Sequence, residues 1–483
     1  MEQKGGAHIS RATLSIWNED ECRQAHEATI SVLERTGVEV KYEQALEAFA
    51  GIGARVDKHR VRFDASVVKR ALETSRKSCL LRSRGNGLAL DIRDGATYFG
   101  TGSDCLYVRD PDTAERRRAM LADIKGMASI CERLPNIDFV MLMGLPADVP
   151  MVVDDLAPVA AMMAGTRKPL LMAPRDGDVL DCMVEMAALA GAAESIAIYA
   201  MPSPPLMHDR DALTKVVRCA ELGIPLVYAP APNAGASAPR TVTATVIVGN
   251  AEVLSGLVLH QAIKPGAPFI YGAGFGAMDM RTSTNPYGAP ETFMGHQASC
   301  DLARYYGLPS FAYAAVSDSK LFDEQLAVEA ALTAVVGALS RATLLHDVGY
   351  LETGMQNSYE SIVLGDELVG WAKAFMRDVL VDNESMALDE IHQVGPGGNH
   401  LARSLTRRKY RDFWQPTMLD HSRFDLWQTE GGLTLGDRVR EKVRLLRADR
   451  REPILADGVR EVLNKVVDSV ISRGRLTRGA GAS

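Results

Sequence analysis

The feature that most restricts the fold of this chain is a pattern that recurs from residue 137 onward. A short apolar run is followed by a loop carrying Pro or Gly and then by a stretch with helical spacing, and the unit begins again about 27 to 44 residues later. Such a unit suits a strand, a loop and a crossover helix. The apolar runs are residues 137–143, 169–173, 196–200, 224–229, 268–272, 310–316 and 342–346.

Runs that are apolar at successive positions are typical of strands covered on both faces in a parallel sheet. Seven such units, with residues 361–364 as an eighth run that closes the ring, predict an α/β fold of the (β/α)8 TIM-barrel type. An open, doubly wound sheet is the alternative. Its usual dinucleotide fingerprint is missing, because Gly272, Gly274 and Gly276 have the wrong spacing for it.

The sequence on either side of the repeated units predicts two additions to the barrel. Residues 1–130 are predicted to form an N-terminal α+β cap, residues 131–380 the TIM barrel, and residues 381–483 a helical C-terminal extension. Asn18 begins the first predicted helix as an N-cap, and Gly37 ends it. The helices of the cap are expected near 18–35, 42–49 and 64–74, and its strands near 80–83, 88–92, 97–100 and 106–109.

The charge and the cysteine content indicate which partners and which cellular compartment to expect. The 483 residues carry a net charge of −7, which argues against a nucleic-acid partner. The seven cysteines are odd in number and widely spaced, as in a reduced cytosolic protein. Residues 1–13 lack the apolar run of a signal peptide. The sequence also has no apolar stretch of about 18 residues without a charge or a helix breaker, so no membrane span is expected. We therefore expect a cytoplasmic protein without a membrane partner, and a homo-oligomer stays open.

Barrel enzymes carry their chemistry on the loops that follow the strands. His346 is the strongest single position, because it closes the apolar run 342–346. A histidine at a strand outlet can donate a hydrogen bond to a carboxylate or exchange protons. The structural alternative is a histidine bonded to a neighbouring loop.

Carboxylates and aromatic rings are also predicted near the strand outlets. A quaternary ammonium group cannot accept hydrogen bonds, so a site for it needs negative charge and aromatic faces. Asp104 and Glu252 are predicted to balance such a cation, and Asn233 to assist His346 in holding a carboxylate. Ordinary packing is the alternative for each ring. The rings predicted to line the cation are Tyr271, Phe275, Tyr313 and Tyr350.

A zinc site is a weaker hypothesis. His296 and Cys300 are four residues apart on a predicted helix and face the same side. No further Cys or His motif supplies the remaining ligands, so packing is favoured and no metal is predicted.

The order and spacing of several segments are similar to those of a known family. From about residue 100 to 427 the chain resembles the trimethylamine methyltransferase family. The resemblance is carried by Gly100-Thr-Gly-Ser-Asp104, Asp110-Pro-Asp-Thr113, Pro202-Ser-Pro-Pro-Leu206, Ala231-Pro-Asn-Ala-Gly235, Ala238-Pro239, Gly249-Asn-Ala-Glu252, Lys264-Pro-Gly-Ala-Pro268, Tyr271-Gly272, Pro290-Glu291, Ser317-Asp-Ser-Lys320, Asp323-Glu-Gln325, His346-Asp-Val-Gly-Tyr-Leu351, Gly395-Pro-Gly-Gly398 and Trp427.

The resemblance implies a TIM barrel in the cytosol that works with a separate corrinoid protein. Founding members of the family carry pyrrolysine, whereas this sequence has only standard residues, so it resembles the pyrrolysine-free branch. That branch implies transfer of a methyl group from a quaternary amine, such as glycine betaine or a related betaine, to the Co(I) corrinoid (cobalamin) of the partner. No tightly bound cofactor is expected, and the particular amine stays open. A TIM-barrel lyase or isomerase and an inactive betaine-binding homologue are the alternatives.

Overall fold

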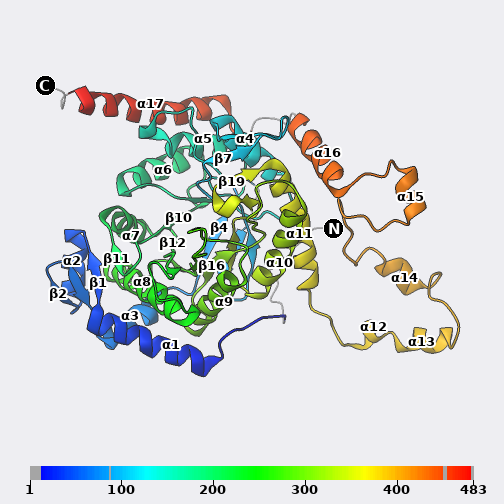
Figure 1. Ribbon diagram of the computed structural model, residues 1–483, viewed down its shortest axis with the longest axis horizontal. Coiled ribbons are helices and arrows are strands. Elements are labelled where there is room, and N and C mark those ends of the chain that lie inside the picture. The colour runs from blue at the N-terminus through cyan, green and yellow to red at the C-terminus, as the bar shows by residue number, and fades with distance from the viewer. Residues whose placement is uncertain (1–11, 86–88, 450–453, 480–483) are drawn as a thin grey trace.

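A computed structural model describes residues 12–85, 89–449 and 454–479, and its centre is a ring of parallel strands (Figure 1). Seven strands are hydrogen-bonded in one parallel sheet. Two isolated parallel bridges, Gly100 to Phe139 and Val140 to Leu170, place the segment around residues 139–140 between the two edges of that sheet. The ring is therefore a closed (β/α)8 barrel. In spatial order the seven strands are β6 (Tyr98–Phe99), β17 (Leu344–His346), β16 (Ser310–Tyr313), β14 (Phe269–Gly272), β12 (Leu226–Tyr228), β10 (Ile196–Ala200) and β9 (Leu170–Met172).

The eighth strand differs from the predicted one. Residues 361–364 lie in helix α11 (Tyr359–Phe375), because Ser358 caps that helix and its first turn is buried. The ring is closed instead by β6, which the sequence analysis placed in the cap. The boundaries at residues 130 and 380 stay predictions, and residues 1–11 of the predicted cap lie outside the described ranges.

The interior of the barrel is filled by side chains from alternate strand positions. Leu171, Ala197, Val227, Ile270 and Phe311 form one buried cluster, while their strand neighbours face the helices. The antiparallel hairpin of β4 (Ser78–Arg82) and β5 (Ala89–Arg93) adds Leu81, Leu90 and Ile92 to this cluster. The surrounding helices are α4 (Leu121–Cys131), α5 (Leu156–Gly165), α6 (Gly177–Leu189), α7 (Arg210–Leu222), α8 (Val242–Ile263), α9 (Pro290–Tyr305), α10 (Glu324–Leu339) and α11.

Helix α8 is long and apolar enough to cross a membrane by length and composition alone. It nevertheless packs against α7 and α9 of the barrel and against α1 (Glu19–Ser31) and α3 (Ala65–Thr74) of the cap. In its most apolar window, 72% of the residues are buried. These contacts are those of a core helix covered on all sides.

The three helices predicted for the cap are confirmed as α1, α2 (Glu43–Gly51) and α3. Asn18 and Glu21 form a reciprocal capping box at the start of α1, and Gly37 follows a π-helical turn, η1 (Val32–Thr36), with φ of 72°. A small sheet ties the cap to the barrel, because a barrel loop strand pairs with it. Its order is β11 (Met207–His208), β1 (Val38–Val40), β3 (Arg60–Arg62) and β2 (Arg55–Asp57).

A second small sheet lies next to the carboxyl-terminal ends of the barrel strands. It carries part of the loop that follows β17, and residues 110–115 form its outer turn. We call it the mouth sheet, and we call the carboxyl ends of the barrel strands with their loops the barrel mouth. The strand order of the mouth sheet is β18 (Tyr350–Leu351), β19 (Gln356–Ser358), β7 (Tyr107–Arg109) and β8 (Arg116–Arg118). Other short elements of the chain are β13 (Asn233–Ala234), β15 (Gly276–Ala277), η2 (Met151–Val153) and η3 (Glu352–Gly354).

The chain after α11 is helical, as predicted for the C-terminal extension. Helix α16 (Leu435–Ala448) packs on α11 and α4, and α17 (Asp457–Gly479) packs on α5 and α6. Between α11 and α16 the chain stands away from the barrel (Figure 1). That segment contains α12 (Asn383–Met386), α13 (Leu388–Val394), α14 (Ser404–Lys409) and α15 (Phe424–Thr429).

Candidate active site at the barrel mouth

His346 ends strand β17 and points toward the barrel interior, like Leu344 two positions earlier. Its ring stacks on Phe311 with centroids 3.9 Å apart, and its Nδ1 lies 2.6 Å from Oδ1 of Asp347. The carboxylate therefore fixes the orientation of the imidazole. Nε2 is buried and has no hydrogen-bond partner in the part of the chain that the structure describes. The ring of His346 is therefore fixed in orientation, and its Nε2 is available to a ligand.

Tyrosine rings from several elements gather around His346. Tyr313, at the end of β16, meets His346 edge to face at 4.7 Å. Tyr287, from the loop after β15, stacks on Tyr313 at 5.1 Å and lies 6.3 Å from the ring of Tyr350. Tyr199 of β10 lies 6.5 Å from His346. These rings offer aromatic faces to a cation at the mouth.

Two carboxylates belong to the same cluster. Burial raises the pKa of Asp104, and the negative charge of Asp347 raises it further, while a hydrogen bond from Ser103 lowers it. Asp104 nevertheless exposes surface, so its carboxylate is enclosed by protein and still open to solvent. Gly102 permits this crowding, since a Cβ there would lie 2.2 Å from the ring of Tyr350 and 2.4 Å from Oδ1 of Asp347.

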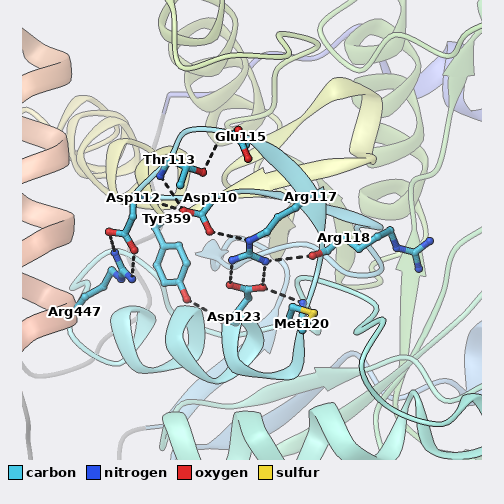
Figure 2. Close-up of polar contacts among 10 residues, drawn as sticks. All are labelled: Asp110, Asp112, Thr113, Glu115, Arg117, Arg118, Met120, Asp123, Tyr359 and Arg447. Carbon is cyan, nitrogen blue, oxygen red and sulfur yellow. Dashed lines mark hydrogen bonds and ion pairs between the residues drawn. The ribbon is translucent and has the colours of Figure 1, made fainter.

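Figure 2 shows the polar network that anchors the mouth sheet, the sheet to which Tyr350 belongs. Arg117 on β8 donates to Asp123 at the start of α4, at 2.6 and 2.8 Å, and to Asp110 in the outer turn at 2.8 Å. Arg447 of α16 contacts Asp112 in the same turn at 2.7 and 2.9 Å. The sheet that carries Tyr350 is therefore tied to the barrel and to the C-terminal region.

Asp318, in the loop after β16, stabilises the loop that carries Tyr287. Its carboxylate accepts hydrogen bonds from the backbone N–H groups of Tyr287 and Gly288, at 2.9 and 2.8 Å. These bonds occupy both of its oxygens, so Asp318 orients the loop of Tyr287.

Four of the predicted site residues thus lie together: His346, Asp104, Tyr313 and Tyr350. Two predicted rings lie elsewhere. Ile270 points into the barrel, so Tyr271 points outward, where its hydroxyl donates to Asn250 of α8 at 3.0 Å. Phe275 is buried against Gly295 of α9, at the side of a cavity of about 640 Å³ that also includes Arg240 and Arg281.

Glu252 and Asn233 also stand apart from the cluster. Oε1 of Glu252, on α8, accepts a hydrogen bond from the backbone N–H of Leu206 at 2.5 Å, and burial raises the pKa of the carboxyl to about 8. Glu252 therefore supports the loop after β10. Asn233 pairs with Gly276 between β13 and β15, and its buried Oδ1 has no partner among the described residues.

His296 of α9 is close to the cluster, since its ring lies 4.2 Å from that of Tyr313. Burial lowers its pKa to about 3, so it is a neutral ring there. Within the described ranges, no group of three or more His, Cys, Asp or Glu side chains is arranged to hold a metal ion, so His296 and Cys300 find no further ligands there.

Sequence reasoning missed Tyr199, Tyr287, Phe311 and Asp347. The pleat of a strand gave a usable signal for two of them, because Tyr199 and Phe311 share the inward face with Ala197 and with Tyr313. Tyr287 lies on a long loop, and its position depends on hydrogen bonds to Asp318 that no local pattern reveals.

The sequence profile described as trimethylamine methyltransferase (MTTB) matches residues 3–473. The chain belongs to the trimethylamine methyltransferase family. The resemblance drawn from the motifs is thereby confirmed, and the chain is a methyltransferase by family.

Two relatives illustrate the range of this trimethylamine methyltransferase family. The glycine betaine methyltransferase of Desulfitobacterium hafniense (strain Y51) is 31% identical over 427 residues, which cover 86% of this chain and 89% of the relative. Trimethylamine methyltransferase MttB of Methanosarcina barkeri (strain Fusaro / DSM 804) is 30% identical over 481 residues, which cover 95% of this chain and 96% of the relative.

The fold agrees with a solved structure of a related kind. The crystal structure of the Methanosarcina barkeri monomethylamine methyltransferase (MtmB) matches with a TM-score of 0.54 and covers 90% of this chain and 89% of that chain. The two sequences are 14% identical, so this likeness concerns the fold alone. The predicted TIM-barrel class is confirmed.

Proposed function

We propose that this methyltransferase moves a methyl group from a quaternary amine of the betaine class to the Co(I) corrinoid of a separate partner protein. The observation that carries the proposal is the cluster of Tyr199, Tyr287, Tyr313 and Tyr350 around two carboxylates at the barrel mouth. A methylated ammonium binds through aromatic faces and nearby negative charge, and this cluster offers both. We place the reaction in the cytoplasm, a reducing compartment that suits the seven free cysteines.

His346 supplies the proposed contact to the other end of a betaine. A carboxylate-paired imidazole can carry a proton on each nitrogen, and it then donates through Nε2. That nitrogen is unpartnered among the described residues, so it can donate to a substrate carboxylate. This contact would favour glycine betaine over trimethylamine, which has no carboxylate. In this proposal, Asn233 and Glu252 stabilise loops of the barrel mouth.

The chain's own part in the reaction is to bind and orient the amine. The C–N bond breaks with its electron pair remaining on nitrogen, so the leaving group is a neutral amine and needs no general acid. The corrinoid, when its carrier protein is docked, supplies the nucleophile that accepts the methyl group. The rings hold the ammonium in line, and Asp104 and Asp347 balance its charge until it is lost.

The test combines the purified enzyme, its corrinoid protein kept as Co(I), and single methylated amines. Glycine betaine and related betaines should change the corrinoid spectrum and release the demethylated amine, and trimethylamine should react more slowly. His346→Ala should lower kcat/KM for the betaine by at least tenfold, because the carboxylate loses its donor. His59→Ala, a change at an exposed turn of the cap, should leave it unchanged. If no amine changes the spectrum although betaine binds by calorimetry, the chain is a binding homologue and the proposal is wrong.

A further inference from the structure

A segment of the C-terminal region leaves the body of the protein and returns to almost the same place. The guanidinium of Arg377, just after α11, donates to the backbone carbonyl of Asp412 at 3.0 Å. Glu367 of α11 accepts hydrogen bonds from Thr417 and Met418 at about 3 Å. Residues 378–413 therefore form a loop closed at its base, which we call the arm, and Figure 1 shows it standing away from the barrel.

The arm cannot be stabilised by its own packing. Its helices α12, α13 and α14 are seven residues or shorter, and the structure, which describes all of them, buries no residue of any. Helices of this length are unstable alone in water, and burial of an apolar face usually supplies what they lack. The arm has such side chains, because Val379, Val381, Leu401 and Phe413 are each more than four-fifths exposed. Exposed apolar side chains of this kind are typical of a segment that another molecule covers.

A second set of exposed apolar side chains lies on the body, on α11 and on the neighbouring helix α10. On α11, Trp371 and Phe375 stack with centroids 5.5 Å apart, and both are exposed. On the neighbouring helix α10, Val328 and Leu332 are four residues apart and 57% and 62% exposed. We call these four side chains the body face. A barrel helix normally turns polar side chains outward, so this face also has the character of a covered surface.

The base of the arm lies at the opposite end of the barrel from the active site. Asn136, which precedes the strand segment at residues 139–140, donates from its backbone N–H to Asp366 of α11 at 2.7 Å. Lys373, near the end of α11, contacts Asp138 at 2.8 Å. These contacts belong to the amino-terminal ends of the strands, whereas His346 is at a carboxyl-terminal end. A protein that delivers a methyl acceptor to the mouth therefore approaches from the other end, and a different occupant is needed here.

We propose that the arm of one copy covers the body face of a second copy, and the reverse, in a homodimer with twofold symmetry. Such an interface requires both complementary surfaces on the same chain, and this chain has both. The charges of the arm are also segregated, with Asp382, Glu384 and Asp389 in its first half and Arg407 and Arg408 in its second. Where the two arms pass each other near the twofold axis in opposite directions, the acidic half of one faces the basic half of the other, and each arm continues onto the partner's body face.

Light scattering coupled to size-exclusion chromatography tests the proposal on the full chain. The wild type should have a mass of at least twice 52.3 kDa, and the arm variant Leu401→Glu/Phe413→Glu should have 52.3 kDa at the same concentration. Leu332→Glu on the body face should give the same loss. The matched control is Leu189→Glu on α6, across the barrel from α11, which should keep the wild-type mass. Circular dichroism should show that the barrel helices stay folded in all variants, so that a monomeric variant loses at most the short helices of the arm.

Several results would overturn the proposal. A wild type of 52.3 kDa at micromolar concentration would refute the dimer. Loss of assembly in the arm variant but not in Leu332→Glu would show that arms meet each other and not the body face. An arm variant that keeps its mass but no longer binds the corrinoid protein would assign the arm to that partner. Methyl transfer by a monomeric wild type would leave the proposed function intact, so the two proposals fail separately.

Discussion

Asp104 is the residue in the cluster whose charge state depends most visibly on a ligand. Burial and the charge of Asp347 both raise its pKa, so without a cation the ionised form is disfavoured. A bound ammonium reverses this, because it stabilises both negative charges at short range. The binding of a cation and the ionisation of Asp104 are therefore coupled, and a betaine should bind more tightly as Asp104 loses its proton.

This coupling predicts the behaviour of Asp104→Asn. The amide keeps the shape and the contact with Ser103 but removes the charge, so the Kd for glycine betaine should rise roughly tenfold, or about 1.4 kcal/mol. Calorimetry measures the change. The control ligand is tert-butylacetate, in which carbon replaces the ammonium nitrogen, and its affinity should change little. Equal losses for both ligands would show that Asp104 acts by shape and not by charge.

Glu252 offers a second prediction at the residue scale, concerning stability and pH. Burial raises the pKa of its carboxyl from 4.5 to about 8 in the folded protein. Between these values the folded protein retains a proton that the unfolded chain has released, so the free energy of unfolding falls as pH rises. The stabilisation is complete below about pH 4.5 and is lost as pH rises through about 8. Its size is on the order of a few kcal/mol.

Glu252→Gln should remove this dependence while keeping the hydrogen bond to Leu206, since the amide oxygen can still accept it. We expect the urea denaturation midpoint of the wild type, relative to that of the variant, to decrease between pH 6.5 and 8. The buried histidines are present in both proteins, so their contribution to the pH dependence cancels in the comparison. Parallel pH curves for the two proteins would contradict the assignment.

The position of a site residue could be predicted only where it follows from the residue's place at the end of a strand. His346 was identified because it ends an apolar run, and it does lie at a strand outlet. Tyr271 was assigned to the same mouth from its place in a run, but the alternation along β14 turns it toward Asn250. Glu252 could not be placed from sequence, because its partner is a backbone N–H 46 residues away.

At the scale of elements, Arg117 links the mouth sheet to helix α4. Arg117 joins the turn at Asp110 to the first turn of α4 at Asp123. Arg117→Ala leaves the nearly buried carboxylate of Asp123 without its main partner, which should cost about 1–3 kcal/mol of stability. Activity should also fall, since Tyr350 belongs to the same sheet.

Denaturant unfolding and kinetics together test this prediction. Arg118→Ala removes the exposed neighbouring arginine and should change the stability by less than about 0.5 kcal/mol. A variant of Arg117 that unfolds like the wild type would mean that the mouth sheet is held by its backbone pairing alone.

The helices of the cap could be predicted from the sequence, but the strand that closes the ring could not. The three cap helices follow from caps and spacing that act within a few residues, such as Asn18 with Glu21. The closing strand β6 has two residues, too few to show a period, and its pairing with β17 joins residues some 250 positions apart. The run at 361–364 is apolar because α11 is buried on nearly every side.

For the whole molecule, the barrel and its mouth should respond to a ligand as one unit. The mouth is built from loops of many strands, so a ligand there connects elements that unfold together. A ligand that binds only the folded state stabilises it by about 2.7 kcal/mol at a concentration of 100 Kd. For a chain of 483 residues this corresponds to a rise in Tm of roughly 3 °C.

A thermal-shift series of methylated amines therefore ranks the parts of the ligand that the mouth recognises. At a concentration of 100 times its Kd, glycine betaine should raise Tm by roughly 3 °C, and trimethylamine at the same concentration should raise it by less, because only the betaine reaches Nε2 of His346. In His346→Ala the two ligands should become similar, since the donor to the carboxylate is gone. A rise caused equally by glycine, which has the carboxylate but no methyl groups, would show that the rings do not select an onium ion and that the mouth recognises the carboxylate alone.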